Sequence, residues 1–187
     1  MSSLQVTFPD EWATLPVRDG GREKVHELVL SLAEAGAEAQ QAAEAFFSAL
    51  LPTLDRWGIA GFASLALPDE ESGGLVQAFC AIAVVAAQTG ADAELRTIAE
   101  DGPHPGLERD TRIVRLPTGA AARSAAFRFA EELLDDEGLA PYAGELRYAI
   151  ALPGNRVGIL HFETLSLVYF AELERLFDAI AGTAQVA

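Results

Sequence analysis

The three histidines are the residues of this chain best suited to acid–base or metal chemistry. His161 ends a predicted strand two positions before Glu163, and a His–Glu pair could serve as a general base or as half of a metal site. No HExxH motif or comparable ligand set accompanies this pair. His26 falls on the exposed side of a predicted helix, and His104 stands between two prolines in a predicted loop. We therefore expect structural or solvated histidines, and we assign no catalytic, metal-binding or cofactor-binding residue.

Two runs of acidic residues could attract a cation. They are Asp69-Glu70-Glu71 and Glu131-Glu132 followed by Asp135-Asp136-Glu137. A calcium loop needs alternating oxygen ligands with a glycine at its turn, and neither run has that spacing. We expect solvated loops at both places. Glu172 and Arg175, three apart in a predicted helix, are expected to form an ordinary surface pair.

The motifs of nucleophilic catalysis and of nucleotide binding are missing. There is no Gly-x-Ser-x-Gly sequence, and Cys80 lies in an apolar run without a nearby histidine, where a small buried hydrophobic residue is expected. Gly58-Ile-Ala-Gly61 and Ser72-Gly-Gly74 lack the lysine of a phosphate loop and the dinucleotide fingerprint. Leu116-Pro-Thr-Gly119 is internal and no membrane anchor follows it, so we do not interpret it as a sorting signal.

Composition limits the class of protein. The chain has 187 residues, half of them hydrophobic, which predicts a single domain over residues 1–187 with a real core. The net charge of −15 predicts an acidic surface, which phosphate backbones and anionic lipid headgroups repel, so we expect neither nucleic acid nor a membrane as partner.

A single cysteine excludes an intrachain disulfide and a thiolate metal cluster. No signal peptide is recognisable, and the longest apolar run, Leu75–Ala87, is too short to span a bilayer. We therefore expect a cytoplasmic protein. A lone lysine beside twelve arginines suggests a GC-rich genome.

The elements that would position these residues are clearest near the C-terminus. Residues 146–152 alternate as a half-buried strand, Pro153-Gly154-Asn155 turns the chain, and residues 157–162 form the partner strand of a β-hairpin. Residues 166–182 then predict a helix that folds back onto the hairpin and ends with Gly182 at its C′ position. Its apolar stripe has spacings of 3, 4 and 3 and consists of Phe170, Leu173, Phe177 and Ile180.

The N-terminal part predicts an extended segment followed by one long helix. Residues 6–17 read as an extended segment interrupted by two prolines, which suits an edge strand or an entry loop. Apolar residues then recur at spacings of three and four from Arg22 to about Asp55, which predicts a continuous helix. Gly36 is a weak point, and Pro52 is expected to kink or end the helix. The predicted stripe is Val25, Leu28, Val29, Leu32, Ala39, Ala43, Phe46, Leu50 and Leu54.

The middle of the chain predicts two more strand pairs and a short helix. Residues 57–67 and Leu75–Ala87 flank an acidic, glycine-rich turn and predict a hairpin. Because Leu75–Ala87 is apolar on both faces, we predict a central strand with layers above and below it. Residues 91–100 predict a short helix, and residues 111–116 and 122–130 predict the remaining strand pair.

Together these elements predict an α+β fold. It has an antiparallel β-sheet of about six strands, with the long N-terminal helix and the C-terminal helix packed on it. The entry segment Phe8-Pro9 with Trp12, the final stretch Leu176–Gly182 and the order of the elements resemble a group of uncharacterised actinobacterial proteins, which are similar to the Mog1/PsbP-like α/β/α sandwich. Relatives of that fold are mostly binding modules: a nuclear-transport cofactor, a photosystem subunit and chaperone-like proteins that serve bacterial secretion effectors. The resemblance implies non-enzymatic protein binding and transfers no functional residue.

The preferred functional prediction is a non-catalytic protein-binding or adaptor module, such as a secretion chaperone or accessory protein, with a protein partner and no cofactor. Two alternatives remain open: an enzyme that uses scattered residues such as His161 and Glu163, and a small-ligand carrier with an apolar cavity between sheet and helix. A homodimer also remains open. Trp12 and Trp57 lie next to predicted element ends, where an aromatic ring can anchor a partner, although core packing is the favoured interpretation.

Overall fold

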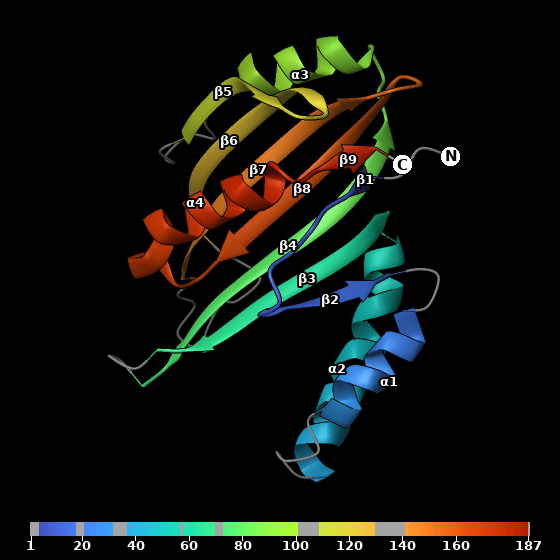
Figure 1. Cartoon of the computed structure of the whole chain (residues 1–187), viewed down its shortest axis with the longest axis vertical. Helices are drawn as coiled ribbons and strands as arrows, with labels where there is room; N and C mark the ends of the chain where they lie inside the picture. Colours follow the sequence, from blue (N-terminus) through green and yellow to red (C-terminus); the bar gives the residue numbers. More distant parts are fainter. Residues whose placement is uncertain are drawn as a thin grey trace.

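A seven-stranded antiparallel sheet forms the centre of the molecule (Figure 1). The computed structural model describes residues 4–17, 21–31, 37–56, 58–69, 73–100, 109–129 and 141–186. The strand order is β2-β3-β4-β8-β7-β6-β5, and a separate two-stranded sheet joins β1 to β9. The predicted α+β class with a dominant antiparallel sheet is confirmed, although there are seven strands in this sheet where about six were expected.

The bounds of the elements are as follows. The main sheet contains β2 (Trp12–Pro16), β3 (Ile59–Pro68), β4 (Leu75–Ala86), β5 (Arg109–Leu116), β6 (Gly119–Phe129), β7 (Tyr142–Leu152) and β8 (Arg156–Thr164). The small sheet contains β1 (Leu4–Gln5) and β9 (Gln185–Val186). The helices are α1 (Gly21–Ser31), α2 (Ala37–Arg56), α3 (Ala91–Glu100) and α4 (Phe170–Ala181), the last preceded by a short 3₁₀ turn, η3 (Leu167–Tyr169).

The three predicted strand pairs are all hairpins of the main sheet. β3 pairs with β4, β5 with β6 and β7 with β8, each antiparallel. The last hairpin closes with Leu152 opposite Arg156, and its turn contains Gly154 at φ 75° and Asn155 at φ 57°. Asparagine is one of the few residues with a side chain that enter this left-handed region readily, so the local sequence suits the turn. Of the two alternatives for residues 6–17, an edge strand or an entry loop, the edge strand is confirmed for Trp12–Pro16, because β2 is the first strand of the sheet.

The prediction of one long N-terminal helix is wrong. The chain forms two helices, α1 and α2, that pack side by side (Figure 1). An apolar spacing of three and four describes each helix of such a pair as well as it describes one continuous helix, so the pattern alone does not reveal the break. Gly36, the predicted weak point, lies outside the described residues. Pro52 does not end α2, which continues to Arg56, and the Thr53 hydroxyl donates to the Ala49 carbonyl oxygen at 3.3 Å beside it.

One face of the main sheet is covered by α4, where the largest part of the core lies. Leu173, Phe177 and Ile180 of the predicted stripe are buried, and the Phe177 ring stacks on Phe162 of β8 at 4.7 Å. The end of α4 differs from the prediction. Gly182 has a φ of −63°, so it is not a left-handed C′ residue, and the Thr183 hydroxyl instead donates to the Ile180 carbonyl oxygen at 2.7 Å.

A buried ionic network attaches α4 to the sheet. Arg123 of β6 is only 3% exposed, and its Nε and Nη2 lie 2.8 Å from Asp178 Oδ1 and 2.6 Å from Glu174 Oε1. The hydroxyl of Tyr148 on β7 donates to the same Asp178. Burial, together with the hydrogen bond to Asp178, raises the pKa of Tyr148, so this side chain remains a donor.

The opposite face of the sheet is covered at its two ends by different helices. Leu15 of β2 and Phe62 of β3 pack with residues of α1 and α2, whereas Ala149 and Val157 of β7 and β8 pack with Leu95 of α3. Cover is therefore incomplete over β4, where Phe79 is 37% and Val85 is 38% exposed. The prediction that the segment Leu75–Ala87 is covered on both faces is wrong, although β4 is an interior strand.

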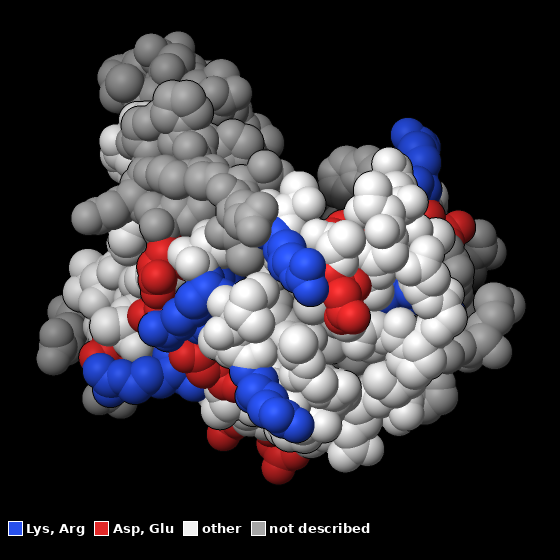
Figure 2. Space-filling view, turned by 90° about the horizontal axis from the view of Figure 1, so that it is seen from above, with Lys and Arg blue, Asp and Glu red and all other residues white. Residues whose placement is uncertain are grey.

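The surface carries charges of both signs. Figure 2 shows arginine and lysine side chains lying beside acidic ones on the side of the molecule that it views. The net charge of −15 is therefore not spread as a uniform acidic coat. Among the described residues, no helix combines the length and the hydropathy that crossing a lipid bilayer requires.

Candidate functional site

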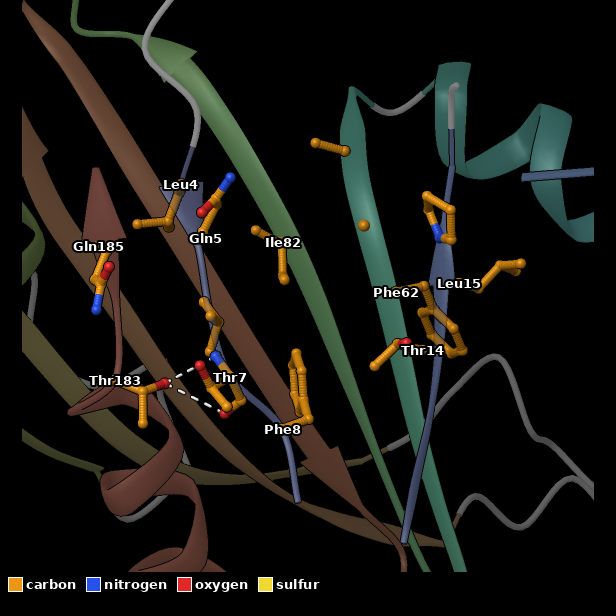
Figure 3. A pocket seen from close by; sticks show the side chains of 14 residues that line it. Leu4, Gln5, Thr7, Phe8, Thr14, Leu15, Phe62, Ile82, Thr183 and Gln185 are labelled. Atoms are coloured by element: carbon orange, nitrogen blue, oxygen red, sulfur yellow. Dashed lines mark hydrogen bonds between the residues drawn. The ribbon is translucent and has the colours of Figure 1, made fainter. Parts of the chain in front are cut away.

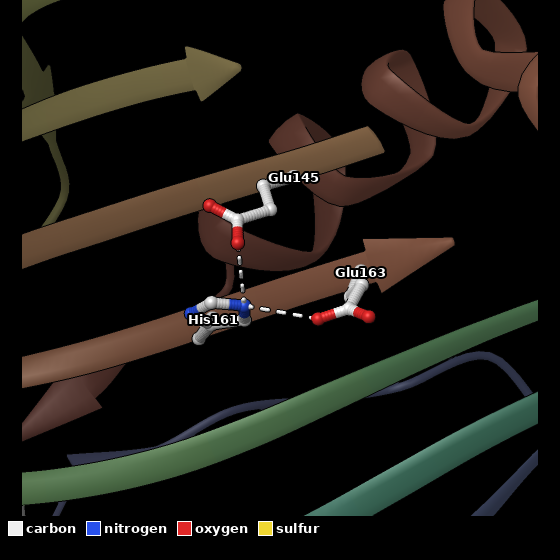
Figure 4. Close-up of side chains that lie close together, drawn as sticks. All are labelled: Glu145, His161 and Glu163. Carbon is white, nitrogen blue, oxygen red and sulfur yellow. Dashed lines mark ion pairs between the residues drawn. The ribbon is translucent and has the colours of Figure 1, made fainter. Parts of the chain in front are cut away.

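The predicted His161–Glu163 pair lies on β8, on the face of the sheet turned away from α4 (Figure 4). The two residues are two apart on one strand, so their side chains leave the same face. Register brings a third residue to them, because Glu145 of β7 is directly opposite Glu163. His161 Nε2 lies 3.6 Å from Glu163 Oε2 and 3.9 Å from Glu145 Oε1. We call these three residues the Glu–His–Glu cluster.

Two arginines complete the surroundings of the Glu–His–Glu cluster. Arg128 of β6 places its Nε 2.5 Å from Glu145 Oε1 and its Nη2 2.8 Å from Glu163 Oε2. The same two carboxylate oxygens that face His161 are therefore bridged by one guanidinium. On the other side of the imidazole, Arg147 Nη2 lies 3.4 Å from His161 Nδ1. With neutral histidine, the charges of two carboxylates and two guanidinium groups balance.

The cluster could in principle hold a divalent cation or supply a general base. One ligand atom from each of its residues lies within 4.8 Å of the other two, which is close enough for a three-ligand site after small movements. However, a cation would compete with Arg128 for both carboxylates. A donor from Arg147 to Nδ1 would also require the proton of a neutral imidazole to sit on Nε2, the atom that a metal would need. The geometry therefore favours a satisfied polar network over a metal centre.

The electrostatics of Glu163 agree with that assignment. The hydrogen bond from His161 lowers the pKa of Glu163, partial burial opposes this shift, and Arg128 adds to the lowering. The carboxylate is thus held in its ionised form, as expected for the acceptor in a network of donors. A general base poised near neutral pH would need the opposite shift.

The other predicted candidates are not brought together. His26 is exposed on α1, beside a hollow of about 290 Å³ between α1 and α2, and Cys80 is buried within β4. Asp69 accepts a hydrogen bond from the Tyr169 hydroxyl at 2.9 Å. Glu172 and Arg175 of α4 are both exposed, and no ion pair joins them among the described contacts. The remaining predicted residues lie outside the described part of the chain: Trp57, Glu70, Glu71, His104, Glu131, Glu132, Asp135, Asp136 and Glu137.

Trp12 is buried in the core, as favoured from the sequence. It is 5% exposed, and its ring lies 5.3 Å from Phe8 and 6.3 Å from Phe177. Burial on this scale removes it as a free interface anchor, since such anchors need exposed area before a partner arrives.

A second candidate site, which the sequence did not reveal, is a groove near the N-terminus (Figure 3). It lies between the segment Leu4–Phe8 on one side and β2 on the other, with Gly61 of β3 and Ile82 of β4 between them. Its volume is about 460 Å³, within the range typical of ligand pockets. We call it the N-terminal groove.

The lining of the N-terminal groove is free of charge. Fourteen described residues line it, and none of them is Asp, Glu, Lys, Arg or His, although 22% of the chain is charged. Apolar side chains such as Phe8 and Ile82 are combined with the amides of Gln5 and Gln185 and the hydroxyl of Thr14. Such a surface favours an uncharged ligand, because a charge placed there would lose water without gaining a counter-charge.

One residue of the Glu–His–Glu cluster that we missed could have been predicted from the sequence, whereas the N-terminal groove could not. Glu145 could have been placed opposite Glu163 by continuing the predicted hairpin outward from its turn, since each step pairs one further residue on both strands. The groove depends on the pairing of β1 with β9, whose residues are about 180 positions apart, and two-residue strands leave no periodicity to detect.

The fold and these sites describe an α+β protein in which helices pack on both faces of one antiparallel sheet and cover the second face only at its two ends. No known family model matches the sequence, and no curated protein matches it. The structure is similar to the crystal structure of LpqN, which is involved in cell envelope biogenesis of Mycobacterium tuberculosis. The TM-score is 0.54 at 9% sequence identity, and the alignment covers 100% of this chain and 84% of LpqN. At this identity the likeness establishes a shared fold and nothing about residues or activity.

Proposed function

We propose that this chain is a non-catalytic protein-binding module, with an accessory or chaperone-like role. The observation that carries the proposal is the N-terminal groove, an uncharged recess beside an open strand edge in an otherwise highly charged protein. The Glu–His–Glu cluster is a weaker candidate for a functional site than the groove, because Arg128 already forms ion pairs with both of its carboxylates.

One structural likeness and one resemblance in sequence support the proposal. The fold is shared with LpqN, a protein involved in cell envelope biogenesis, and an assembly pathway of that kind is one place to look for a partner. The entry segment and the final helix resemble actinobacterial proteins of the Mog1/PsbP-like group, whose relatives are mostly binding modules. Cytoplasmic residence remains part of the proposal. Fractionation of the host cells separates it from an envelope location.

The test is affinity capture from a lysate of the organism that encodes the chain, at near-physiological salt. The matched control is an unrelated protein of similar size and net charge, which removes partners attracted by acidity alone. We expect one protein recovered in about equal amount with the chain and absent from the control. Recovery of the chain alone, or only with further copies of itself, would contradict the adaptor function, and the second of these outcomes would favour a homodimer.

A small-ligand carrier is the second candidate, and the size of the groove favours it. A volume of about 460 Å³ could hold an uncharged molecule of moderate size. Native mass spectrometry of the freshly purified chain distinguishes the two functions. A carrier retains a bound mass that denaturation releases, whereas a protein-binding module shows the mass of the chain itself.

A further inference from the structure

The open edge of the small sheet lies in the N-terminal groove. β1 pairs with β9 on one side only, and no other described strand pairs with it. Figure 3 shows β9 on one side of the β1 segment and the groove on the other. A strand edge of this kind is a ready template for an additional strand. A two-stranded sheet also gains more from a third strand than a large sheet does.

We propose that the N-terminal groove binds an extended, uncharged peptide segment as a third strand beside β1. This inference rests on the proposed protein-binding function and specifies its site, its mode and the chemistry of the recognised segment. Adding a strand to an open edge uses backbone hydrogen bonds for affinity and the surrounding side chains for selectivity.

The backbone of the segment Leu4–Phe8 is oriented for this mode of binding. The Thr7 N–H donates to Thr183 Oγ1 at 2.9 Å, and the Thr7 carbonyl oxygen lies 3.2 Å from the same hydroxyl (Figure 3). Both backbone groups of Thr7 thus point toward Thr183. The register that pairs Leu4 with Val186 and Gln5 with Gln185 places Thr7 opposite Thr183, so we infer that the segment continues the extended course of β1. In an extended chain the backbone groups of successive residues point in opposite directions, which directs those of Val6 away from Thr183 and toward the groove. An incoming strand would meet them there.

The floor of the groove leaves room for a backbone to approach. Gly61 of β3 has no side chain, and a Cβ built on it would meet only the side chain of Ile82, at 3.6 Å. A glycine inside a strand often marks a place where another backbone comes close. On the β2 side, Thr14 and Pro16 are exposed and face the same recess. The floor can therefore take an extended segment without rearrangement of the sheet.

The lining sets the chemistry of the segment. A Lys, Arg, Asp or Glu side chain buried there would find no opposite charge among the fourteen lining residues. The amides of Gln5 and Gln185 and the hydroxyls of Thr7 and Thr14 can both donate and accept hydrogen bonds. We therefore expect a segment of apolar and neutral polar residues, in which β-branched side chains favour the extended form.

The experiment uses a displayed library of random heptapeptides selected on the whole chain, followed by fluorescence anisotropy with the most enriched peptide. Gly61→Val and Thr14→Trp fill the groove from its floor and from β2. A Cβ at position 61 makes only an ordinary contact and Thr14 is exposed, so both variants should fold, which thermal unfolding checks. Ala66→Val is the control, since it introduces the same side chain as Gly61→Val at an exposed position of β3 outside the groove.

We expect the enriched peptides to lack Asp, Glu, Lys and Arg. Both groove-filling variants should weaken binding about tenfold or more, because one or two lost backbone hydrogen bonds have about that effect. The Ala66→Val control should bind like the wild type. No enrichment, enrichment of charged peptides, or equal binding by the groove-filling variants would overturn the proposal. If it is overturned while a protein partner is still captured from lysate, the protein-binding function stands and its site lies elsewhere.

Discussion

The buried guanidinium of Arg123 is held by groups that are themselves partly exposed to water. Asp178 is 41% and Glu174 is 32% exposed, whereas Arg123 is only 3% exposed. Asp178 also accepts the hydrogen bond of Tyr148, which is 2% exposed. The two partners therefore contribute unequally to the free energy of unfolding. Removing the Asp178 side chain leaves buried donors of Arg123 and Tyr148 without that acceptor, whereas removing Arg123 leaves carboxylates that water can solvate.

Asp178→Ala should consequently destabilise the protein more than Arg123→Met. We expect about 2–3 kcal/mol for Asp178→Ala, from the lost charge-assisted hydrogen bonds of a buried arginine and tyrosine, and about 1 kcal/mol for Arg123→Met. Urea unfolding followed by circular dichroism measures both. Arg175→Ala, an exposed position on the same helix, is the control and should leave the free energy of unfolding unchanged. An equal or larger loss for Arg123→Met would refute this account of the network.

Glu163 should make the stability of the protein dependent on pH in a defined direction. Its pKa is lowered in the folded state, first by the hydrogen bond from His161, so its ionised form stabilises the fold above its ordinary pKa of 4.5. That contribution is lost as the pH falls through the lowered folded-state value. Glu163→Gln should therefore cost about 1 kcal/mol at neutral pH, and the difference from wild type should shrink below pH 4.5. A difference that grows toward low pH would show that the carboxylate is not held by its donors.

At the residue scale, the contacts that follow from alternation along one strand could be predicted from the sequence. The contacts that depend on the register between neighbouring strands could not. His161 and Glu163 were paired because they are two apart on one strand. Alternation along β6 separates Arg128 from Phe127 and Phe129, but nothing local indicates that it bridges two glutamates. Its position next to Glu145 follows from the pairing of β6 with β7, across a 12-residue connection of which 130–140 lie outside the described part.

At the element scale, Asn155 couples the last hairpin to α3. Its Oδ1 accepts the Ala91 N–H at 3.0 Å, where α3 begins, and its Nδ2 donates to the Ala87 carbonyl oxygen at 3.1 Å. The first N–H groups of a helix have no partner within the helix, so this contact satisfies one of them. The same residue also occupies the left-handed conformation that the turn requires.

Replacing Asn155 separates these two roles. Asn155→Gly keeps the backbone conformation and loses the side-chain hydrogen bonds, which should cost about 1–2 kcal/mol. Asn155→Ala loses the same bonds and adds the strain of a Cβ at positive φ, so it should cost about 1 kcal/mol more. Thermal unfolding of the two variants provides the comparison. A more stable alanine variant would mean that the turn relaxes to another conformation.

Some sequence patterns predict how consecutive elements are connected, and others do not. The hairpins were predicted because alternation and a turn signal occur together within about twenty residues. The N-terminal helix was predicted as one element because the apolar spacing continues unchanged through a reversal of the chain. Side-by-side helices bury one stripe each, and a single helix buries one stripe of the same period, so periodicity cannot distinguish the two arrangements.

At the scale of the whole molecule, the two ends of the chain form a single feature. β1 and β9 lie side by side and pair with each other (Figure 1). The Thr7 backbone bonds to Thr183, and the segment Leu4–Phe8 lines one side of the N-terminal groove (Figure 3). The groove is uncharged although the chain has a net charge of −15. The expectation that neither nucleic acid nor a membrane is a partner rests on the charged part of the surface. In our proposal, the partner binds at the uncharged groove instead.

The most direct test of the protein-binding proposal is hydrogen exchange of the chain, free and in complex with the partner captured from lysate. We predict slower exchange on binding in residues 4–8 and in β2, because an added strand satisfies and shields the backbone there. Exchange in β5, the opposite edge of the main sheet, should not change. Protection confined to β5 or to α1 and α2, or no change anywhere, would contradict recognition at the N-terminal groove.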